Sequence, residues 1–214
     1  MPPPFRDVRA ILFDWDGTLL NSFEADAAAY LAMFRALGIP WTLADLERHY
    51  SPDWYRIYRA ARLPRAHWAR ADRIWRLHYS RHESELMPGA RGVLDALSAR
   101  FIVGLVTSGD GSRVRRELRR FGLTRLFRAR IYAESTERRK PHPAPLELAL
   151  RRLRAVPESA VYVGDAPEDI LMARRAGVRS IAVLGSFPTH ARLRAARPDA
   201  LIERIVHLPR LFEE

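Results

Sequence analysis

The sequence predicts an α/β fold: a doubly wound parallel, Rossmann-like sheet that carries an inserted all-helical cap domain. Short apolar runs alternate with helical segments along most of the chain, and one long helical segment interrupts this rhythm. Alternating strands and helices are typical of a parallel sheet with helices on both faces. A third observation places a site on this sheet, because the first apolar run ends in two carboxylates.

The first predicted strand runs from Val8 to Phe13 and is followed by Asp14 and Asp16. It lacks a polar face, which is typical of a strand buried on both sides. Strand side chains alternate, so we expect the two acids to project to one side. The carboxyl ends of such strands are where open α/β sheets bind ligands. Because buried acids are costly without a counter-charge, the pair indicates a site for a metal or another cation.

Gly17 follows these acids and lets the backbone turn sharply or approach a ligand closely. Later in the chain the strand-and-helix rhythm resumes. The further strands are expected at residues 101–106, 131–133, 161–163, 181–184 and 200–202. The helices between them are expected at residues 112–121, 143–153 and 167–176, with one more at the C-terminal end.

The long segment between Asp16 and Phe101 does not fit this rhythm. It spans about 85 residues, whereas a whole βαβ unit takes roughly 30. The excess holds 11 of the 21 aromatic residues, including four of the five Trp, enough for a small core of its own. We therefore expect residues 21–85 to form a helical cap domain, and residues 1–20 and 86–214 to form the catalytic core.

Sequence signals also mark the starts of the cap helices. Asn21 or Ser22, then Thr42, then Ser51 before Pro52 are expected to cap three of them. Pro64 is expected to separate a fourth helix from the third.

Composition limits the other possibilities. The net charge is +11, yet 35 of the 36 basic residues are Arg and they are spread through every predicted helix. No nucleic-acid motif is present, so we expect no specific nucleic-acid partner. No cysteine is available for a disulfide or thiol chemistry. No run approaches the ~18 apolar residues of a membrane span, and no apolar signal region precedes the first strand, so a cytoplasmic protein without a membrane partner is expected.

Four short motifs carry a resemblance to a known family. Asp14-Trp15-Asp16-Gly17-Thr18 resembles the first motif of the haloacid dehalogenase-like hydrolase superfamily. Val106-Thr107-Ser108-Gly109 resembles its second motif, Lys140-Pro141 its third, and Gly164-Asp165-Ala166-Pro167-Glu168-Asp169 its fourth. The motifs stand in the family's order, at predicted strand ends or in the loops after them. The resemblance covers nearly the whole chain and is greatest to the phosphoglycolate-phosphatase-like branch.

One residue departs from the family's first motif: Trp15 stands where the family usually has Phe. We expect its side chain to point away from the acids.

The resemblance implies a role for each motif. Asp14 is expected to be the nucleophile that forms an aspartyl-phosphate. Asp16 is expected to protonate the leaving oxygen and then to deprotonate the attacking water. Lys140 is expected between Asp14 and the transferring phosphoryl group. The remaining candidates for binding the phosphoryl oxygens are Gly17, Thr18, Thr107, Ser108 and Gly109.

The fourth motif suggests a metal site. Asp165 and Asp169 are expected on the first turn of a helix that starts at Pro167, four residues apart and on one face. One interpretation is that these acids only complement a helix N-terminus. Opposite Asp14 and Asp16 they would instead form a four-carboxylate cluster that needs a cation. Oxygen ligands with room for phosphate and water suit Mg²⁺. We expect Asp14, the Asp16 carbonyl and Asp165 as direct ligands, and Asp169 either as a ligand or behind them.

These features predict a Mg²⁺-dependent phosphatase, monomeric or homodimeric, that hydrolyses a small phosphorylated metabolite resembling phosphoglycolate. One alternative is a sugar phosphomutase similar to β-phosphoglucomutase, although the cap lysine associated with that branch has no counterpart here. Another is a non-catalytic member that binds phosphate or a protein. The presence of Asp14, Asp16, Lys140 and Asp165 argues for an enzyme.

Overall fold

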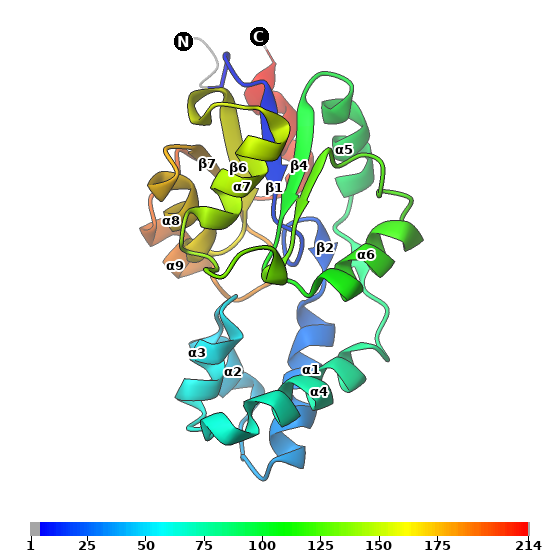
Figure 1. The fold of residues 1–214 in the computed structure, drawn as a ribbon, viewed down its shortest axis with the longest axis vertical. Coiled ribbons are helices and arrows are strands. Elements are labelled where there is room, and N and C mark those ends of the chain that lie inside the picture. Colours follow the sequence, from blue (N-terminus) through cyan, green and yellow to red (C-terminus); the bar gives the residue numbers. More distant parts are fainter. Residues whose placement is uncertain (1–4, 214) are drawn as a thin grey trace.

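The computed structural model describes residues 5–213. Its main sheet has six parallel strands in the order β5-β4-β1-β6-β7-β8 (Figure 1). The strands are β1 (Ala10–Phe13), β4 (Ile102–Val106), β5 (Ala129–Ile131), β6 (Ala160–Gly164), β7 (Arg179–Val183) and β8 (Ala200–Ile202). The predicted fold class is confirmed. The expected strand at 131–133 lies two residues earlier, because the chain turns into a 3₁₀ helix at Ala133.

Strand β1 lies inside this sheet, between β4 and β6. All four of its residues are fully buried, and their alternation sends them to opposite faces. Ile11 and Phe13 belong to one hydrophobic core, Ala10 and Leu12 to the other. The position after β1 is therefore fixed from both faces and both edges, which gives Asp14 a rigid support.

Helices cover both faces of the sheet. One core includes side chains of α5 (Ala90–Ser98), α6 (Gly111–Arg120) and the C-terminal 3₁₀ helix at Ile205–Phe212. The other core includes side chains of α7 (Ala144–Leu153) and α8 (Pro167–Arg175). A short helix, α9 (His190–Ala195), contributes Leu193 to a smaller cluster with Ile170 of α8 and Ala182 of β7.

The segment between β1 and α5 contains four helices that lie together at one end of the sheet (Figure 1). These are α1 (Phe23–Ala36), α2 (Leu43–His49), α3 (Trp54–Ala60) and α4 (Trp68–Tyr79). Where the chain leaves and re-enters the sheet layer, β2 (Leu20–Asn21) pairs antiparallel with β3 (Glu85–Leu86). This two-stranded ribbon joins the helical segment to the rest.

The helical segment has a hydrophobic cluster of its own. Met33, Phe34, Leu46 and Ile57 are fully buried in it. One side chain of the sheet layer also enters this cluster: Phe187 packs against Phe23 and Tyr50, with ring centroids 5.3 and 4.6 Å apart. A separate core agrees with a cap of residues 21–85, although that division of the chain stays a prediction.

The starts of the cap helices follow the sequence only in part. Thr42 caps α2 as expected: its hydroxyl accepts from the backbone N–H of Asp45, and the Asp45 carboxylate accepts from the backbone N–H of Thr42. Helix α3 is capped by Asp53, whose carboxylate accepts from the backbone N–H of Tyr55, and the expected cap Ser51 is wrong. Helix α3 starts at Trp54, two residues later than the sequence suggests, so the Ser51 hydroxyl accepts from the backbone N–H of Asp53, ahead of the helix, and donates to Glu168 of α8. Ser22 precedes α1 but its hydroxyl is also engaged elsewhere, as described below.

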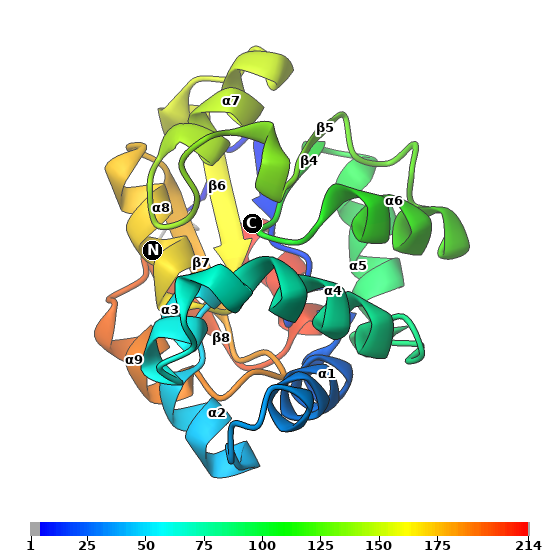
Figure 2. The ribbon, with the colours of Figure 1, turned by 60° about the horizontal axis from the view of Figure 1, so that its bottom comes forward.

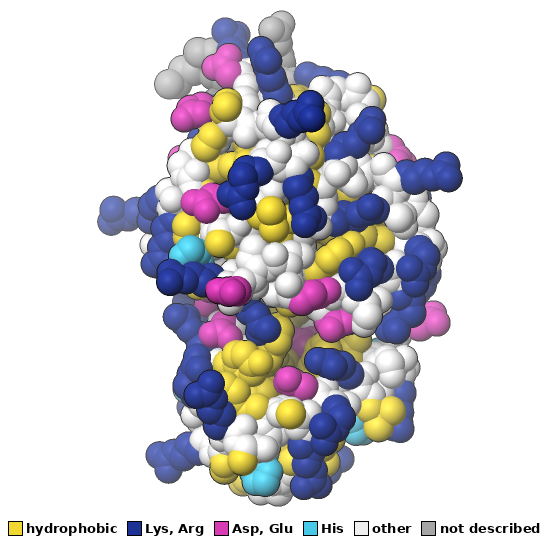
Figure 3. Space-filling model, in the orientation of Figure 1, with side chains coloured by type: hydrophobic (Ala, Val, Ile, Leu, Met, Phe, Trp, Pro, Cys, Tyr) yellow, Lys and Arg dark blue, Asp and Glu magenta, His cyan; other side chains and the backbone are white. Residues whose placement is uncertain are grey.

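The surface in Figure 3 shows basic side chains spread over this face rather than gathered in one patch. It also shows hydrophobic side chains at the seam between cap and sheet, beside a hollow. In the described part of the chain, no helix combines the length and apolarity needed to cross a membrane.

The separate cluster of the helical segment generates a stability prediction. Phe34→Ala removes a fully buried ring whose centroid lies 4.7 Å from that of the Trp41 ring. Such a change typically lowers the free energy of unfolding by about 3–5 kcal/mol. We expect the urea unfolding curve followed by Trp fluorescence to shift to lower urea more than the curve followed by far-UV circular dichroism. Four of the five Trp residues lie between residues 21 and 85.

Leu146→Ala, which empties a buried position of α7 against the sheet, is the matched control. It should shift the circular dichroism curve at least as much as the fluorescence curve. Identical shifts of both signals in both variants would contradict a cap that is stabilised separately.

Candidate active site

A cavity of about 250 Å³ lies between the carboxyl edge of the sheet and the helical segment. Figure 2 looks from the cap side and shows α3 and α4 lying in front of the strand ends. The sheet layer supplies Asp14, Asp16 and Thr107 to its lining, and the helical segment supplies Asp26 and Tyr50. Side chains of the sheet layer and of the helical segment therefore face one shared space.

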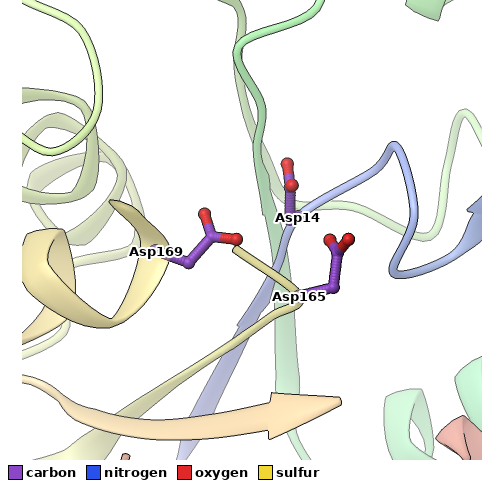
Figure 4. A group of neighbouring side chains, drawn as sticks. All are labelled: Asp14, Asp165 and Asp169. Atoms are coloured by element: carbon purple, nitrogen blue, oxygen red, sulfur yellow. The ribbon is translucent and has the colours of Figure 1, made fainter. Parts of the chain in front are cut away.

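Three carboxylates meet beside this cavity (Figure 4). Asp14 follows β1, Asp165 follows β6, and Asp169 is the third residue of α8. All three are buried, and one carboxylate oxygen of each lies within 4.8 Å of the others. Asp165 precedes α8 by two positions, so the expectation that it lies on the first helical turn is wrong. The bend between β6 and α8 nevertheless turns Asp165 toward Asp14.

Lys140 is the cation of this cluster. Its ammonium nitrogen lies 2.8 Å from Oδ1 of Asp14 and 2.8 Å from Oδ1 of Asp169. Burial by itself would lower the pKa of Lys140, but the negative charges of Asp14 and Asp169 outweigh it and raise that pKa above its usual value. Lys140 is therefore charged throughout the physiological pH range. Its ion pairs join the residue after β1 to the first turn of α8.

One ammonium does not balance three buried carboxylates. Burial raises the pKa of Asp14 to about 7, although Lys140 acts in the opposite direction. Burial and the neighbouring Asp14 and Asp169 raise the pKa of Asp165 well above its usual range. An all-oxygen set with this excess of negative charge fits a hard divalent cation. The residues present thus agree with the metal that the sequence suggests.

Hydrogen bonds hold two of the three acids in place. The Thr18 hydroxyl donates to Asp165 Oδ1 over 2.8 Å. The backbone N–H of Ala166 donates to Asp169 Oδ2 over 3.0 Å. Gly17, between the first motif's acids and Thr18, has φ +80°, and a Cβ there would collide with the Asp165 carboxylate. Glycine is therefore required for Asp165 to approach the first motif this closely.

The Asp16 carboxylate lies apart from this cluster. Arg113 of α6 binds it with two nitrogens, Nη1 lying 2.9 Å from Oδ1 and Nη2 contacting Oδ2. The Ser22 hydroxyl, just before α1, donates to the same Oδ1 over 2.9 Å. The structure thus brings three of the four predicted carboxylates together and directs the fourth toward Arg113. Both Asp14 and Asp16 still line the cavity.

Arg113 connects Asp16 with the cap and with the core. Its Nη1 donates to the Tyr79 hydroxyl of α4 over 3.2 Å and to Glu117 over 3.1 Å. Glu117 in turn accepts from Trp15 Nε1 over 2.7 Å. The Trp15 side chain therefore points into the core and away from the acids, as expected.

The second motif stands at the end of β4. The Thr107 hydroxyl accepts from the backbone N–H of Gly109 over 2.9 Å, which shapes the loop that follows the strand. Thr107, Ser108 and Gly109 all line the cavity. The structure therefore gathers the residues of the four motifs at one end of the sheet.

Sequence reasoning did not identify Arg113, Glu117, Tyr79 or Asp26. Arg113 and Glu117 are four apart on a helix, a spacing that usually indicates an exposed ion pair. Asp26 lies in α1, lines the cavity and accepts from Trp75 Nε1 over 3.1 Å. Burial raises its pKa to about 8. No motif marks these residues, because their contacts join segments that are far apart in the sequence.

Known proteins resemble this chain over nearly its full length. A family model described as "Haloacid dehalogenase-like hydrolase" matches residues 11–183. A phosphoglycolate phosphatase of Xylella fastidiosa is 35% identical over 85% of this chain and 82% of its own length. The pyrophosphatase PpaX of Oceanobacillus iheyensis is 28% identical over 92% of this chain and 94% of its own.

A similar fold is seen in a crystal structure from Haemophilus somnus, described as a predicted phosphoglycolate phosphatase. The TM-score is 0.86 at 22% identity, and the match covers 97% of this chain and 99% of that one. At this identity the likeness shows the fold alone.

The carboxylate cluster generates a prediction for pH. Folding raises the Asp14 pKa from 3.8 to about 7, so the folded state holds a proton that the unfolded state has already lost. The stability that this proton confers is complete below 3.8 and is lost as the pH rises through about 7. We therefore expect the metal-free protein to melt at a lower temperature at pH 8 than at pH 5.5.

Mg²⁺ should raise the melting temperature more at pH 8 than at pH 5.5, because it binds ionised carboxylates. Calorimetry with EDTA or with Mg²⁺ at both pH values measures both effects. Equal stabilisation by Mg²⁺ at the two pH values would contradict a metal site formed by these acids.

Proposed function

The chain belongs to the haloacid dehalogenase-like hydrolase family, and from that premise we propose that it is a Mg²⁺-dependent phosphatase. It would hydrolyse a small phosphomonoester through an aspartyl-phosphate on Asp14. The observation that carries this proposal is the contact of Lys140 with Asp14, at a strand end that faces the cavity between sheet and cap. A nucleophile beside a fixed cation suits transfer of an anionic phosphoryl group.

Asp14 would attack phosphorus with one carboxylate oxygen. The attacking group must be ionised, and the neighbouring Lys140 ammonium favours that form. Attack forms a bond between a carboxylate oxygen and phosphorus and breaks the bond to the leaving oxygen. The Lys140 charge also lies where the negative phosphoryl group would come close to the Asp14 carboxylate, which reduces the repulsion between them.

Asp16 would move the protons. It would donate one to the leaving oxygen and later accept one from the water that hydrolyses the aspartyl-phosphate. Its contacts with Arg113 and Ser22 fix the carboxylate at the cavity wall, and one of these contacts would open when an Asp16 oxygen takes up the proton. A fixed donor costs less reorganisation at the moment of transfer.

Asp14 and Asp165 would hold Mg²⁺ with the Asp16 carbonyl. Asp169 already contacts Lys140 and the Ala166 N–H, which favours a role in holding Lys140 over direct ligation. When bound, the metal supplies positive charge that offsets the phosphoryl oxygens. The second motif, with Gly17, Thr18 and Lys140, would surround those oxygens; in this set the Thr18 hydroxyl already serves Asp165.

The relatives' names and the cavity size favour a small substrate. The relatives include a phosphoglycolate phosphatase and a pyrophosphatase, and about 250 Å³ accommodates a compound of that size. The cap, proposed as residues 21–85, would exclude water from the aspartyl-phosphate. A screen of phosphate release over phosphoglycolate, pyrophosphate, nucleoside monophosphates and sugar phosphates tests the substrate.

Asp14→Asn tests the nucleophile. The amide is nearly isosteric but a poor nucleophile, so we expect kcat to fall by several orders of magnitude while the fold is kept. Phosphate release and circular dichroism measure the two properties. A variant that keeps more than about a tenth of the wild-type kcat, a barrier change of only ~1.4 kcal/mol, would show that Asp14 is not the nucleophile.

Lys140→Arg tests the compact cation. Lys140 is the only lysine of the chain, and its buried ammonium contacts two carboxylates. A guanidinium is planar and wider, so it cannot occupy that space without displacing them. We expect kcat/KM to fall at least about 100-fold although the charge is kept.

Arg138→Lys, on the exposed neighbouring residue, is the matched control and should leave kcat/KM unchanged. Near wild-type activity in Lys140→Arg would contradict the claim that catalysis requires a compact ammonium beside Asp14.

A further inference from the structure

Arginines line the cavity at three positions, and they differ in what they contact. Arg113 is paired with Asp16 and Glu117. Arg76 is exposed at the side of α4. Arg139 also lines the cavity, but its Nη1 is buried and has no hydrogen-bond partner among residues 5–213. A buried donor without an acceptor is costly. Arg113 also has one such nitrogen, Nε, but its Nη nitrogens bind Asp16 and Glu117. No ion pair or side-chain hydrogen bond among residues 5–213 engages Arg139, so it differs from Arg113 in having no acceptor at all.

Aromatic rings of the cap hold Arg139 in place. Its guanidinium carbon lies 4.0 Å from the centroid of the Trp54 ring and 5.3 Å from that of Tyr55, both in α3. Stacking satisfies the face of the guanidinium and leaves the N–H groups at its edge available to an acceptor. The arrangement orients a cation without neutralising it.

Trp54 carries a second unused donor. Its indole Nε1 is buried, and within the described residues it has no hydrogen-bond partner. Trp54 lines the cavity as Arg139 does. Two buried donors on stacked side chains, one of them charged, form a site for a negatively charged acceptor.

The carboxylates of the cavity do not fill this site. Asp26 accepts from Trp75, and Asp72 accepts from the Tyr58 hydroxyl over 2.8 Å. Asp110 caps α6, and Glu134 accepts from the backbone N–H of Gly111. Each of these acids is engaged with another group and none of them bonds to Arg139 Nη1, which leaves this nitrogen available to an acceptor on a ligand.

The position of Arg139 indicates what that acceptor belongs to. It directly precedes Lys140, which contacts Asp14. We propose that Arg139 and Trp54 form a binding site for a second anionic group, a carboxylate or a second phosphoryl group, on the leaving group of the substrate. This deepens the proposed function, on which it rests, by naming the substrate class: phosphomonoesters or anhydrides whose leaving group is itself an anion.

Three substrates separate the second anion from the transferring group. Phosphoglycolate carries a carboxylate, pyrophosphate carries a second phosphoryl group, and 2-hydroxyethyl phosphate has the size of phosphoglycolate but a neutral leaving group. Arg139→Met should lower kcat/KM by about 10- to 100-fold for whichever of the two anionic compounds the enzyme prefers. It should change kcat/KM for 2-hydroxyethyl phosphate less than about threefold.

Trp54→Phe removes the indole N–H but keeps an aromatic face, so it should cause a smaller, equally selective loss. Arg138→Met is the matched control, because Arg138 is exposed and contacts His142 instead of lining the cavity. It should leave all three substrates unchanged. A loss of equal size for all three substrates in Arg139→Met, or no loss, would overturn the proposal.

Binding separates this proposal from the proposed function. Calorimetric titration of the Asp14→Asn protein with phosphoglycolate, pyrophosphate and 2-hydroxyethyl phosphate needs no turnover. Suppose that the wild type releases no phosphate, but that one anionic compound binds at least tenfold tighter than 2-hydroxyethyl phosphate and loses this advantage in Arg139→Met. The proposed phosphatase activity is then wrong, and the proposed anion site is supported. Equal affinities for all three compounds, in proteins with and without Arg139, would overturn the proposed anion site and would not contradict the proposed phosphatase activity.

Discussion

The ion pairs of Lys140 are the contact on which the site depends. One buried ammonium lies 2.8 Å from Asp14 and 2.8 Å from Asp169, so it joins the end of the central strand to the start of α8. Such a pair is costly to bury and is strongly destabilising when one partner is removed. The excess negative charge that remains, with Asp165 included, explains why the site suits a divalent cation. The same geometry places a cation beside the proposed nucleophile.

The helical segment completes this site instead of merely covering it. Ser22 and Tyr79 bind the Asp16 and Arg113 pair, Ser51 binds Glu168, and Trp54 stacks on Arg139. Each contact joins a polar group of the sheet layer to the cap. The proposed proton transfer by Asp16 and the proposed recognition of the leaving group therefore depend on the position of the cap, whereas the carboxylate cluster is built within the core alone.

The sequence predicted the fold because its strands are continuous apolar runs and its acids stand at their ends. The excess length after Asp16 likewise indicated a helical insertion. Motif order identified Asp14, Lys140 and Asp165: the two acids directly follow β1 and β6, and the lysine lies in the connection between β5 and α7. Local signals were weaker: Thr42 caps its helix, but α3 starts later than Ser51-Pro52 suggests and is capped by Asp53. Arg113 and Arg139 could not be identified from the sequence, because in a chain with 35 arginines only tertiary contacts distinguish them from surface cations.

The central claim is that Asp14 becomes covalently phosphorylated. The most direct measurement mixes the Mg²⁺-loaded enzyme with substrate, quenches it in acid within one turnover, and reduces the acyl-phosphate with borohydride before peptide mass spectrometry. Reduction converts an aspartyl-phosphate to homoserine. We expect homoserine at position 14, dependent on substrate and absent from Asp14→Asn. Phosphate release without any modified residue, or with the modification at another position, would contradict it.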